Sequence, residues 1–175
     1  MTRGLALFDT PLGPCGIAWG ERGVAGVQLP EDTPAETRAR LRRRFPDARE
    51  LPPPPAVQAA IDGMVALLSG EPNDLSAVAL DMGAVPEFNR RVYELARTIP
   101  PGATMTYGEL ASRLGEPGAA RAVGRALGQN AFPIVVPCHR VLAAGGKTGG
   151  FTARGGVRTK LRLLAIERSA GPLFE

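Results

Sequence analysis

The chain has 175 residues, of which 44% are hydrophobic and 22% charged, a composition typical of a soluble globular protein with one domain or two small ones. No apolar run approaches the roughly 18–20 residues that a membrane span needs, and Asp9 interrupts the apolar start that a signal peptide would extend. Two cysteines and one histidine are too few for a disulfide framework or a four-ligand zinc site. We therefore expect a reduced, cytoplasmic protein with no membrane, metal or cofactor partner.

The charge is divided unevenly along the chain. Residues 1–87 carry 8 arginines against 12 acidic residues, a net −4, whereas residues 88–175 carry 13 basic residues against 5 glutamates, a net +8. A basic half beside an acidic half points to a polyanionic partner such as a nucleic acid. Composition bias is the alternative, because 19 of the 21 basic residues are arginine.

The first segment predicts an antiparallel meander. Three short apolar runs are separated by turn sequences, namely Leu5–Phe8, Cys15–Trp19 and Val24–Leu29. A helix over residues 33–44 follows, because Thr33, Pro34 and Glu36 supply an N-cap, a first-turn proline and a capping-box acid. We expect the arginines of this helix to form a solvated face.

Proline and glycine interrupt the chain near its middle. The stiff connector Pro52–Pro55 precedes an amphipathic helix over Ala56–Ser69, and the alternating segment Leu75–Met82 predicts one more strand. The loop-rich region between residues 70 and 86 is the expected boundary. It divides the chain into a support domain, residues 1–80, and a second domain, residues 81–175.

The second half has a helix-turn-helix pattern. After a helix over Phe88–Arg97, the capping-box sequence at Thr106 opens a short helix over Tyr107–Leu114, and Gly115 and Pro117 separate it from a helix over Gly118–Gln129. Many helix pairs in bundles share this pattern, so it is a weak indication by itself.

The last of these helices has two contrasting faces. Its apolar stripe consists of Ala119, Ala122, Val123, Ala126 and Leu127. Arg121 and Arg125 project from the opposite face, where Gly124 and Gly128 leave the surface nearly bare. Such a face suits close contact with DNA or RNA, although tight helix packing beside solvated arginines is the alternative.

The chemistry is expected at Cys138 and His139. The strand-like run Ile134–Pro137 leads directly into this cysteine and the only histidine of the chain. An imidazole near a thiol promotes formation of the nucleophilic thiolate, and a third group commonly orients the imidazole. Glu167, in an apolar-periodic helix, is the best candidate for that group. A buried, unreactive cysteine is the alternative, and it is the state that we expect for Cys15.

Several motifs resemble the O6-alkylguanine-DNA alkyltransferase family, also called methylated-DNA–protein-cysteine methyltransferases. They are Thr106-Tyr107-Gly108-Glu109-Leu110-Ala111, Ala120-Arg121-Ala122-Val123-Gly124, Asn130, Pro137-Cys138-His139-Arg140-Val141, Gly149-Gly150-Phe151 and Lys160 with Leu163, Leu164 and Glu167. The resemblance covers residues 88–168. It implies an α+β fold, with a ribonuclease-H-like first domain around a small antiparallel sheet and a mainly helical, winged-helix-like second domain.

The resemblance implies direct reversal of DNA damage. The thiolate of Cys138 would take the alkyl group from a flipped-out O6-alkylguanine in a single turnover. His139 would deprotonate the thiol through a water, Glu167 would orient the imidazole, and Asn130 would brace the turn. Tyr107 would donate a proton to the departing guanine.

The same resemblance implies the DNA contacts. Arg121 would fill the space left by the flipped base of double-stranded DNA, and the other expected contacts are Tyr107, Asn89, Ala122 and Arg125. The base pocket is expected from Leu127, Val136, Pro137, Thr148, Gly149, Gly150, Phe151 and Thr152. The protein is expected to act as a monomer.

The chain departs from the family pattern at Tyr93, Pro101, Glu116, Arg125 and Thr152. We expect these departures to affect DNA affinity and the range of alkyl groups accepted, and not the reaction itself.

A non-catalytic relative that binds alkylated DNA and recruits repair proteins is the main alternative, but such relatives replace the reactive cysteine. A Cys-His hydrolase or thiol oxidoreductase would leave the basic half unexplained. A transcription factor would need a dimerisation or effector segment.

Overall fold

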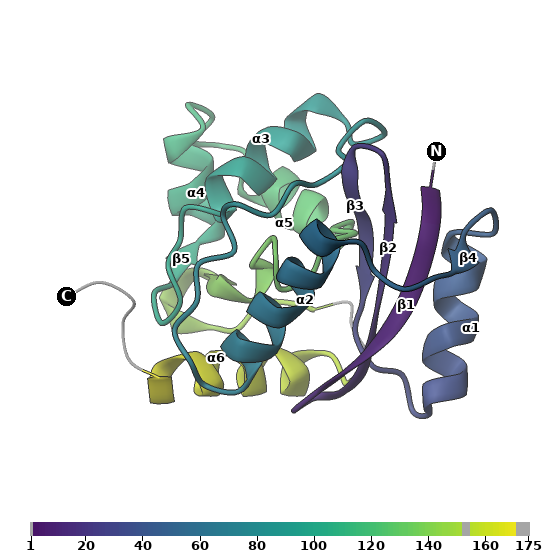
Figure 1. Ribbon diagram of the computed structural model, residues 1–175. Coiled ribbons are helices and arrows are strands. Elements are labelled where there is room, and N and C mark those ends of the chain that lie inside the picture. Colours follow the sequence, from purple (N-terminus) through teal and green to yellow (C-terminus); the bar gives the residue numbers. More distant parts are fainter. Residues whose placement is uncertain (1, 152–154, 171–175) are drawn as a thin grey trace.

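A four-stranded sheet forms one side of the protein in the computed structural model, which describes residues 2–151 and 155–170 (Figure 1). The strands β1 (Thr2–Thr10), β2 (Gly13–Gly20), β3 (Gly23–Gln28) and β4 (Arg49–Glu50) lie in the order β3-β2-β1-β4. The predicted meander is confirmed, since β1, β2 and β3 pair antiparallel. The sheet as a whole is mixed rather than antiparallel, because β4 returns beside β1 in the parallel direction.

The two hairpin turns depend on glycine. Gly13 and Gly23 open β2 and β3 with φ angles of 116° and 118°, a region that side chains with a Cβ rarely adopt. The turn sequences that predicted the meander therefore contain the glycine that each turn requires.

Helices cover both faces of this sheet (Figure 1). Helix α1 (Pro34–Arg44) begins as predicted, because the Thr33 side chain accepts a hydrogen bond from the Glu36 amide at 3.1 Å. It covers one face, where its buried Leu41 packs with Leu5 and Ala18. The long helix α2 (Pro55–Leu68) contacts strand β1 of the sheet. It also packs against the C-terminal helix α6 (Val157–Ala170).

The predicted strand over Leu75–Met82 is wrong. Only Leu80 forms an isolated bridge, with Val24, and the rest of the segment is irregular. The physical reason is the side chain of Arg97, whose Nη2 donates to the carbonyl oxygens of Leu75, Ser76 and Val78 at 2.8–3.2 Å. A guanidinium thus takes acceptors that a neighbouring strand would otherwise use.

The predicted helices of the second half are confirmed, with small changes in their ends. They are α3 (Glu87–Ala96), α4 (Tyr107–Arg113) and α5 (Ala120–Gly128). Helices α4 and α5 pack against each other across a turn in which Gly115 has a φ of 81°, so the expected helix pair is present. The Thr106 side chain caps α4 by accepting a hydrogen bond from the Glu109 amide at 3.0 Å.

The run Ile134–Pro137 is not the predicted strand. It is a tight turn with an isolated bridge between Pro133 and Val136, and the Val136 amide donates to the Phe132 carbonyl at 2.8 Å. A 3-10 turn, Cys138–Arg140, and the short strand β6 (Val141–Leu142) follow. Strand β6 pairs in parallel with β5 (Met105–Thr106), which places the start of α4 beside the cysteine turn.

One hydrophobic core runs through both halves of the chain. It includes Ile17 of the sheet, Met64 of α2, Val92 of α3, Val123 of α5 and Leu163 of α6. In the part of the chain that the structure describes, no helix combines the length and apolar character needed to span a membrane.

Candidate active site and nucleic-acid interface

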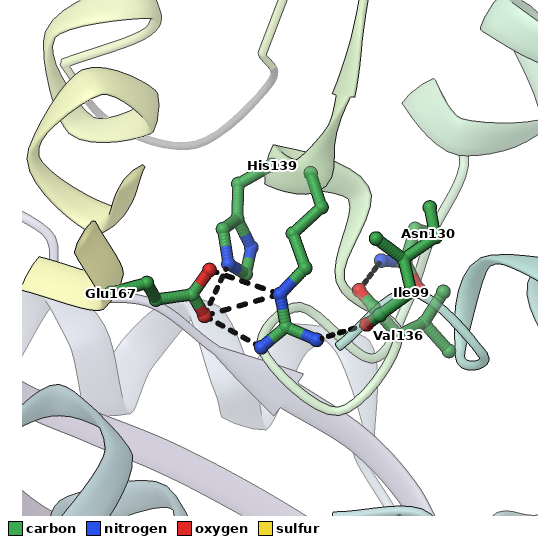
Figure 2. Close-up of polar contacts among 6 residues, drawn as sticks. Ile99, Asn130, Val136, His139 and Glu167 are labelled. Carbon is green, nitrogen blue, oxygen red and sulfur yellow. Dashed lines mark hydrogen bonds and ion pairs between the residues drawn. The ribbon is translucent and has the colours of Figure 1, made fainter. Parts of the chain in front are cut away.

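A buried ion-pair network includes His139, the residue that follows Cys138 in the chain (Figure 2). His139 and Glu167 are only 1% and 3% exposed, and the distance from His139 Nε2 to Glu167 Oε2 is 3.0 Å. Arg140 donates to the same carboxylate from Nη2 at 2.6 Å and from Nε at 2.9 Å. Its Nη1 donates to the Ile99 carbonyl at 2.7 Å. The network thus joins the cysteine turn to α6 and to the segment that follows α3.

Glu167 is the anion of this network. Burial alone raises its pKa, but hydrogen bonds from His139 and Arg140 together with their charges outweigh that effect and lower the pKa to about 2. The carboxylate is therefore ionised at neutral pH. It lies near the end of α6 and is buried rather than exposed to solvent.

His139 is held as a neutral imidazole. Burial lowers its pKa, and the hydrogen bond and charge of Glu167 oppose this only in part. We assign the ring proton to Nε2, because an ionised Glu167 can only accept a hydrogen bond. The other nitrogen, Nδ1, is then a base, and it is buried without a hydrogen-bond partner among the described residues.

The Cys138 thiol is half-buried and protonated at rest. Burial raises its pKa, while the Asn130 side chain, the charge of Lys160 and two backbone amides oppose the rise. Such a thiol needs a base to become a nucleophile. Cys15 is fully buried in β2, which confirms the expectation of a core cysteine, and burial raises its pKa to about 11.

Asn130 closes the turn that carries Cys138. Its Nδ2 donates to the Val136 carbonyl at 3.0 Å (Figure 2), and its Oδ1 accepts from the Phe132 amide at 2.9 Å. The Cys138 amide donates to the same Val136 carbonyl at 2.8 Å. These bonds hold Ile134 at a φ of 76°, which is unfavourable for a β-branched residue and requires support from its surroundings.

Tyr107 lines the same cavity as Cys138, and Lys160 lies next to Tyr107. Lys160 is fully buried, and its Nζ donates to the Val141 carbonyl at 2.7 Å, the Gly150 carbonyl at 3.3 Å and the Tyr107 hydroxyl at 3.4 Å. A Cβ on Gly149 would lie 2.5 Å from that hydroxyl, so this glycine allows the tyrosine to approach. The ammonium group is therefore fixed within hydrogen-bond distance of the phenol, and its charge favours the thiolate form of Cys138.

A cavity of about 610 Å³ opens above these groups. Its lining includes Cys138, Tyr107, Arg121, Leu127, Gly150 and Phe151, together with small residues of α5. Of the other expected pocket residues, Val136 and Pro137 are buried in the turn behind the thiol, and Gly149 lies beneath Tyr107. Thr148 lines a separate pocket with Leu142 and Leu164. Thr152 lies outside the described residues.

Helix α5 forms one wall of this cavity. Val123, Ala126 and Leu127 are buried, and Arg121 and Arg125 are exposed, which confirms the two predicted faces. Ala122 is half-buried between them. The Asn89 side chain donates to Gln129 Oε1 at 2.9 Å, so this expected DNA contact is bonded to the end of α5.

Comparisons with known proteins match this arrangement. A family model described as 6-O-methylguanine DNA methyltransferase, DNA binding domain, matches residues 87–169. A methylated-DNA–protein-cysteine methyltransferase of Mycobacterium tuberculosis is 38% identical over 165 residues, which are 94% of this chain and 92% of the relative. The chain belongs to the methylated-DNA–protein-cysteine methyltransferase family. A relative of the same name from Methanothermobacter thermautotrophicus is 36% identical over 90% of this chain and 81% of its own length.

Solved structures of this methyltransferase family share the whole fold. The crystal structure of Mycobacterium tuberculosis OGT in complex with DNA has a TM-score of 0.74 and 36% identity, covering 98% of this chain and 99% of that one. The O6-methylguanine-DNA methyltransferase of Pyrococcus kodakaraensis has a TM-score of 0.70 and 26% identity. The N-terminal half, which carries no family motif, therefore belongs to the same architecture.

The sequence predicts no role for two polar residues near this methyltransferase site, although Lys160 belongs to one of the family motifs. Lys160 has a visible signal, because it lies on the inward face of α6 with Leu163, Leu164 and Glu167, where an unpaired charge is costly. Arg44 at the end of α1 gives no such signal, because it follows two other arginines in a helix that is rich in them. It is half-buried and donates to Val27, Gln28 and Ala131.

Two departures from the methyltransferase family pattern have partners in the structure. Tyr93 is buried, and its hydroxyl donates to the Ala126 carbonyl of α5 at 2.6 Å. Glu116, the acid near the expected DNA face, forms an exposed ion pair with Arg91 at 3.4 Å.

Proposed function

We propose that this methyltransferase repairs O6-alkylguanine in duplex DNA by moving the alkyl group to Cys138. The observation that carries the proposal is the position of the thiol. It lines a cavity large enough for a base, and a neutral imidazole with a free, buried Nδ1 follows it in the chain. Family membership supplies the reaction class, and the geometry supports a role for each residue.

The first step is activation of the thiol. His139 Nδ1 accepts the proton of Cys138 through a bridging water, since neighbouring side chains in a chain commonly point apart. Glu167 stabilises the resulting imidazolium through Nε2, and Arg140 keeps that carboxylate ionised. Asn130 and Lys160 favour the thiolate over the thiol.

The second step is in-line displacement at the alkyl carbon. A sulfur–carbon bond forms, the bond between that carbon and O6 breaks, and the electron pair passes to the guanine ring. Tyr107 donates its hydroxyl proton to the departing guanine, and the nearby Lys160 ammonium stabilises the phenolate. The product is a thioether, which ordinary thiols do not reverse, so each molecule acts once.

Helix α5 is the proposed DNA-binding element. Arg121 lines the cavity and is exposed, so it can fill the place of a base flipped into that cavity. Arg125 would contact phosphate one turn along, and the small residues of α5 would allow a close approach to the minor groove, with Ala122 and Asn89 at its edge. Leu127, Gly150 and Phe151 would hold the flipped base, with the remaining expected pocket residues supporting it.

The organisation around this activity is also a proposal. Residues 1–80 would form a ribonuclease-H-like support domain, and residues 81–175 a winged-helix-like domain that binds DNA and accepts the alkyl group. The protein would act in the cytoplasm as a monomer, without metal or cofactor.

Single-turnover stoichiometry tests the proposal. The protein is mixed with increasing amounts of a duplex that carries one O6-methylguanine with a labelled methyl group. The expected result is transfer that stops at one methyl group per protein molecule, with unmodified guanine left in the DNA. Continuous turnover, or release of the methyl group as methanol, would refute it.

A further inference from the structure

Arg44 differs from the other arginines of α1. Its Nη1 donates to the Val27 carbonyl and to Gln28 Oε1, both at 2.9 Å, and its Nη2 donates to the Ala131 carbonyl at 3.2 Å. It forms no ion pair with any described carboxylate. One guanidinium thus joins the end of α1 to β3 and to the segment that carries Cys138.

The surroundings fix the position of this guanidinium. It lies 5.1 Å from the centroid of the Phe45 ring. A Cβ on Gly26 would lie 2.7 Å from Arg44 Nη2 and 2.6 Å from Phe45 Cζ, so glycine leaves the room that both side chains use. Because the planar fork is rigid, its three acceptors are held in one arrangement.

The Ala131 carbonyl belongs to the segment that leads into the turn of Cys138. It accepts a second hydrogen bond, from the Val27 amide at 2.9 Å, and it follows Asn130, which braces the turn through Val136. Arg44, Asn130, Ala131 and Cys138 also line one cavity of about 340 Å³, on the side of the thiol that faces α1 and β3. The anchored end of the turn and the reactive sulfur are therefore neighbours in space.

We propose that Arg44 is a positioning residue, which fixes Ala131 and thereby the neighbouring Asn130, whose hydrogen bonds brace the turn that carries Cys138. The acidic half of the chain then sets the reactivity of a thiol that belongs to the basic half. This inference deepens the proposed function and rests on it for its biological meaning. The thiol itself, however, can be tested without DNA.

The test compares Arg44→Gln with Arg43→Gln in a Cys15→Ala background. Arg43 is one position away, exposed, and without a hydrogen bond or ion pair to the described residues, so the two variants lose the same charge. Iodoacetamide is the probe of Cys138, and its rate is followed against pH beside methyl transfer from an O6-methylguanine duplex. DNA affinity and thermal melting are measured in parallel.

We expect Arg44→Gln to slow both reactions about tenfold, the size of one charge-assisted hydrogen bond. The iodoacetamide profile should also move to higher pH, with DNA affinity unchanged and Arg43→Gln like the parent. An unchanged profile and rate for Arg44→Gln would overturn the inference. If the parent alkylates with iodoacetamide but takes no methyl group from DNA, the proposed function fails and the inference about the thiol is still tested.

Two further variants separate position from charge. Gly26→Ala keeps the guanidinium but takes its space, and Arg44→Lys keeps the charge but loses the fork. Both should react slowly, as Arg44→Gln does, at a temperature where melting shows that they are folded. Parental rates and profiles in both would mean that charge alone suffices, which contradicts a positioning role.

Discussion

Helices α1 and α5 both carry arginines, and they use them in opposite ways. In α1, Arg38 and Arg42 pair with Glu50, and Arg40 pairs with Glu31. In α5, Arg121 and Arg125 are exposed and form no ion pair or hydrogen bond with any described residue. Three arginines of α1 are therefore neutralised within the protein, whereas both arginines of α5 are left for a partner.

The two cysteines show the same contrast. Cys15 lies in the sheet with its pKa raised and only the Thr10 hydroxyl nearby, at 3.6 Å. Cys138 borders two cavities, and the Asn130 side chain and the Lys160 charge both oppose the rise that burial causes in its pKa. The surroundings of each arginine and cysteine therefore indicate function better than the net charge or the number of cysteines does.

The largest expected effect separates the cysteines. Cys138→Ala should abolish methyl transfer, because no other described thiol reaches the cavity, while duplex binding should persist. Cys15→Ala is the matched control and should transfer at the parental rate. Transfer is measured as labelled methyl bound to protein, and residual transfer by Cys138→Ala would contradict the assignment.

The next effect concerns the acid that orients His139. Glu167→Gln should slow methyl transfer about 100-fold, the lower range for loss of general-base catalysis, because the imidazolium loses its anion. Glu50→Gln removes the same charge from the α1 cluster and should leave the rate unchanged. Single-turnover kinetics would measure both, and equal rates for the two variants would contradict the proposed relay.

The contribution of Glu167 to the free energy of unfolding should depend on pH. The Glu167 pKa falls from an ordinary 4.5 to about 2 in the folded protein, so its contribution is complete above pH 4.5 and is lost as pH falls toward 2. This contribution is about 3 kcal/mol of unfolding free energy. Urea unfolding between pH 3 and pH 6 should show the gap between the parent and Glu167→Gln narrowing with acid, and a constant gap would refute the linkage.

Removing an unpaired arginine should matter more than removing a paired one. Arg121→Ala should slow transfer from duplex about tenfold, because the extruded base competes with restacking, and leave transfer from free O6-methylguanine base unchanged. Arg38→Ala, with the same charge change in α1, should behave as the parent on both substrates. Equal losses of Arg121→Ala on duplex and free base would argue against the finger role.

The smallest expected effect comes from the hydrogen bond between Tyr93 of α3 and the backbone of α5. Tyr93→Phe removes the hydrogen bond to the Ala126 carbonyl and should lower the free energy of unfolding by about 1 kcal/mol. Duplex affinity should fall slightly, while the iodoacetamide rate of Cys138 stays at the parental value. A change in that rate without a change in stability would mean that Tyr93 acts on the thiol instead.

The sequence predicts those parts of the molecule whose causes are local. Thr33 and Thr106 cap helices within four residues of themselves, and the stripe of α5 follows from its own periodicity. The Cys138-His139 pair is visible because its motif is contiguous. The same local rules give the wrong strand at residues 75–82, where the side chain of Arg97, about twenty residues away in the chain, takes the backbone acceptors.

The remaining features depend on contacts between distant segments. Arg44 reaches Ala131 across 87 positions, and Arg140 reaches Ile99 across 41. Nothing in the composition of α1 distinguishes Arg44 from Arg43, since only the folded chain brings one of them to β3. The parallel pairing of β4 with β1 is equally a product of where α1 delivers the chain.

The most direct measurement of the central claim is peptide mass spectrometry of the protein after exposure to an O6-methylguanine duplex. Both cysteines are available to be scored in one experiment. The account predicts one added methyl group on the peptide that contains Cys138 and none on the peptide that contains Cys15. A methyl group on Cys15, or an unmodified protein beside repaired DNA, would contradict it.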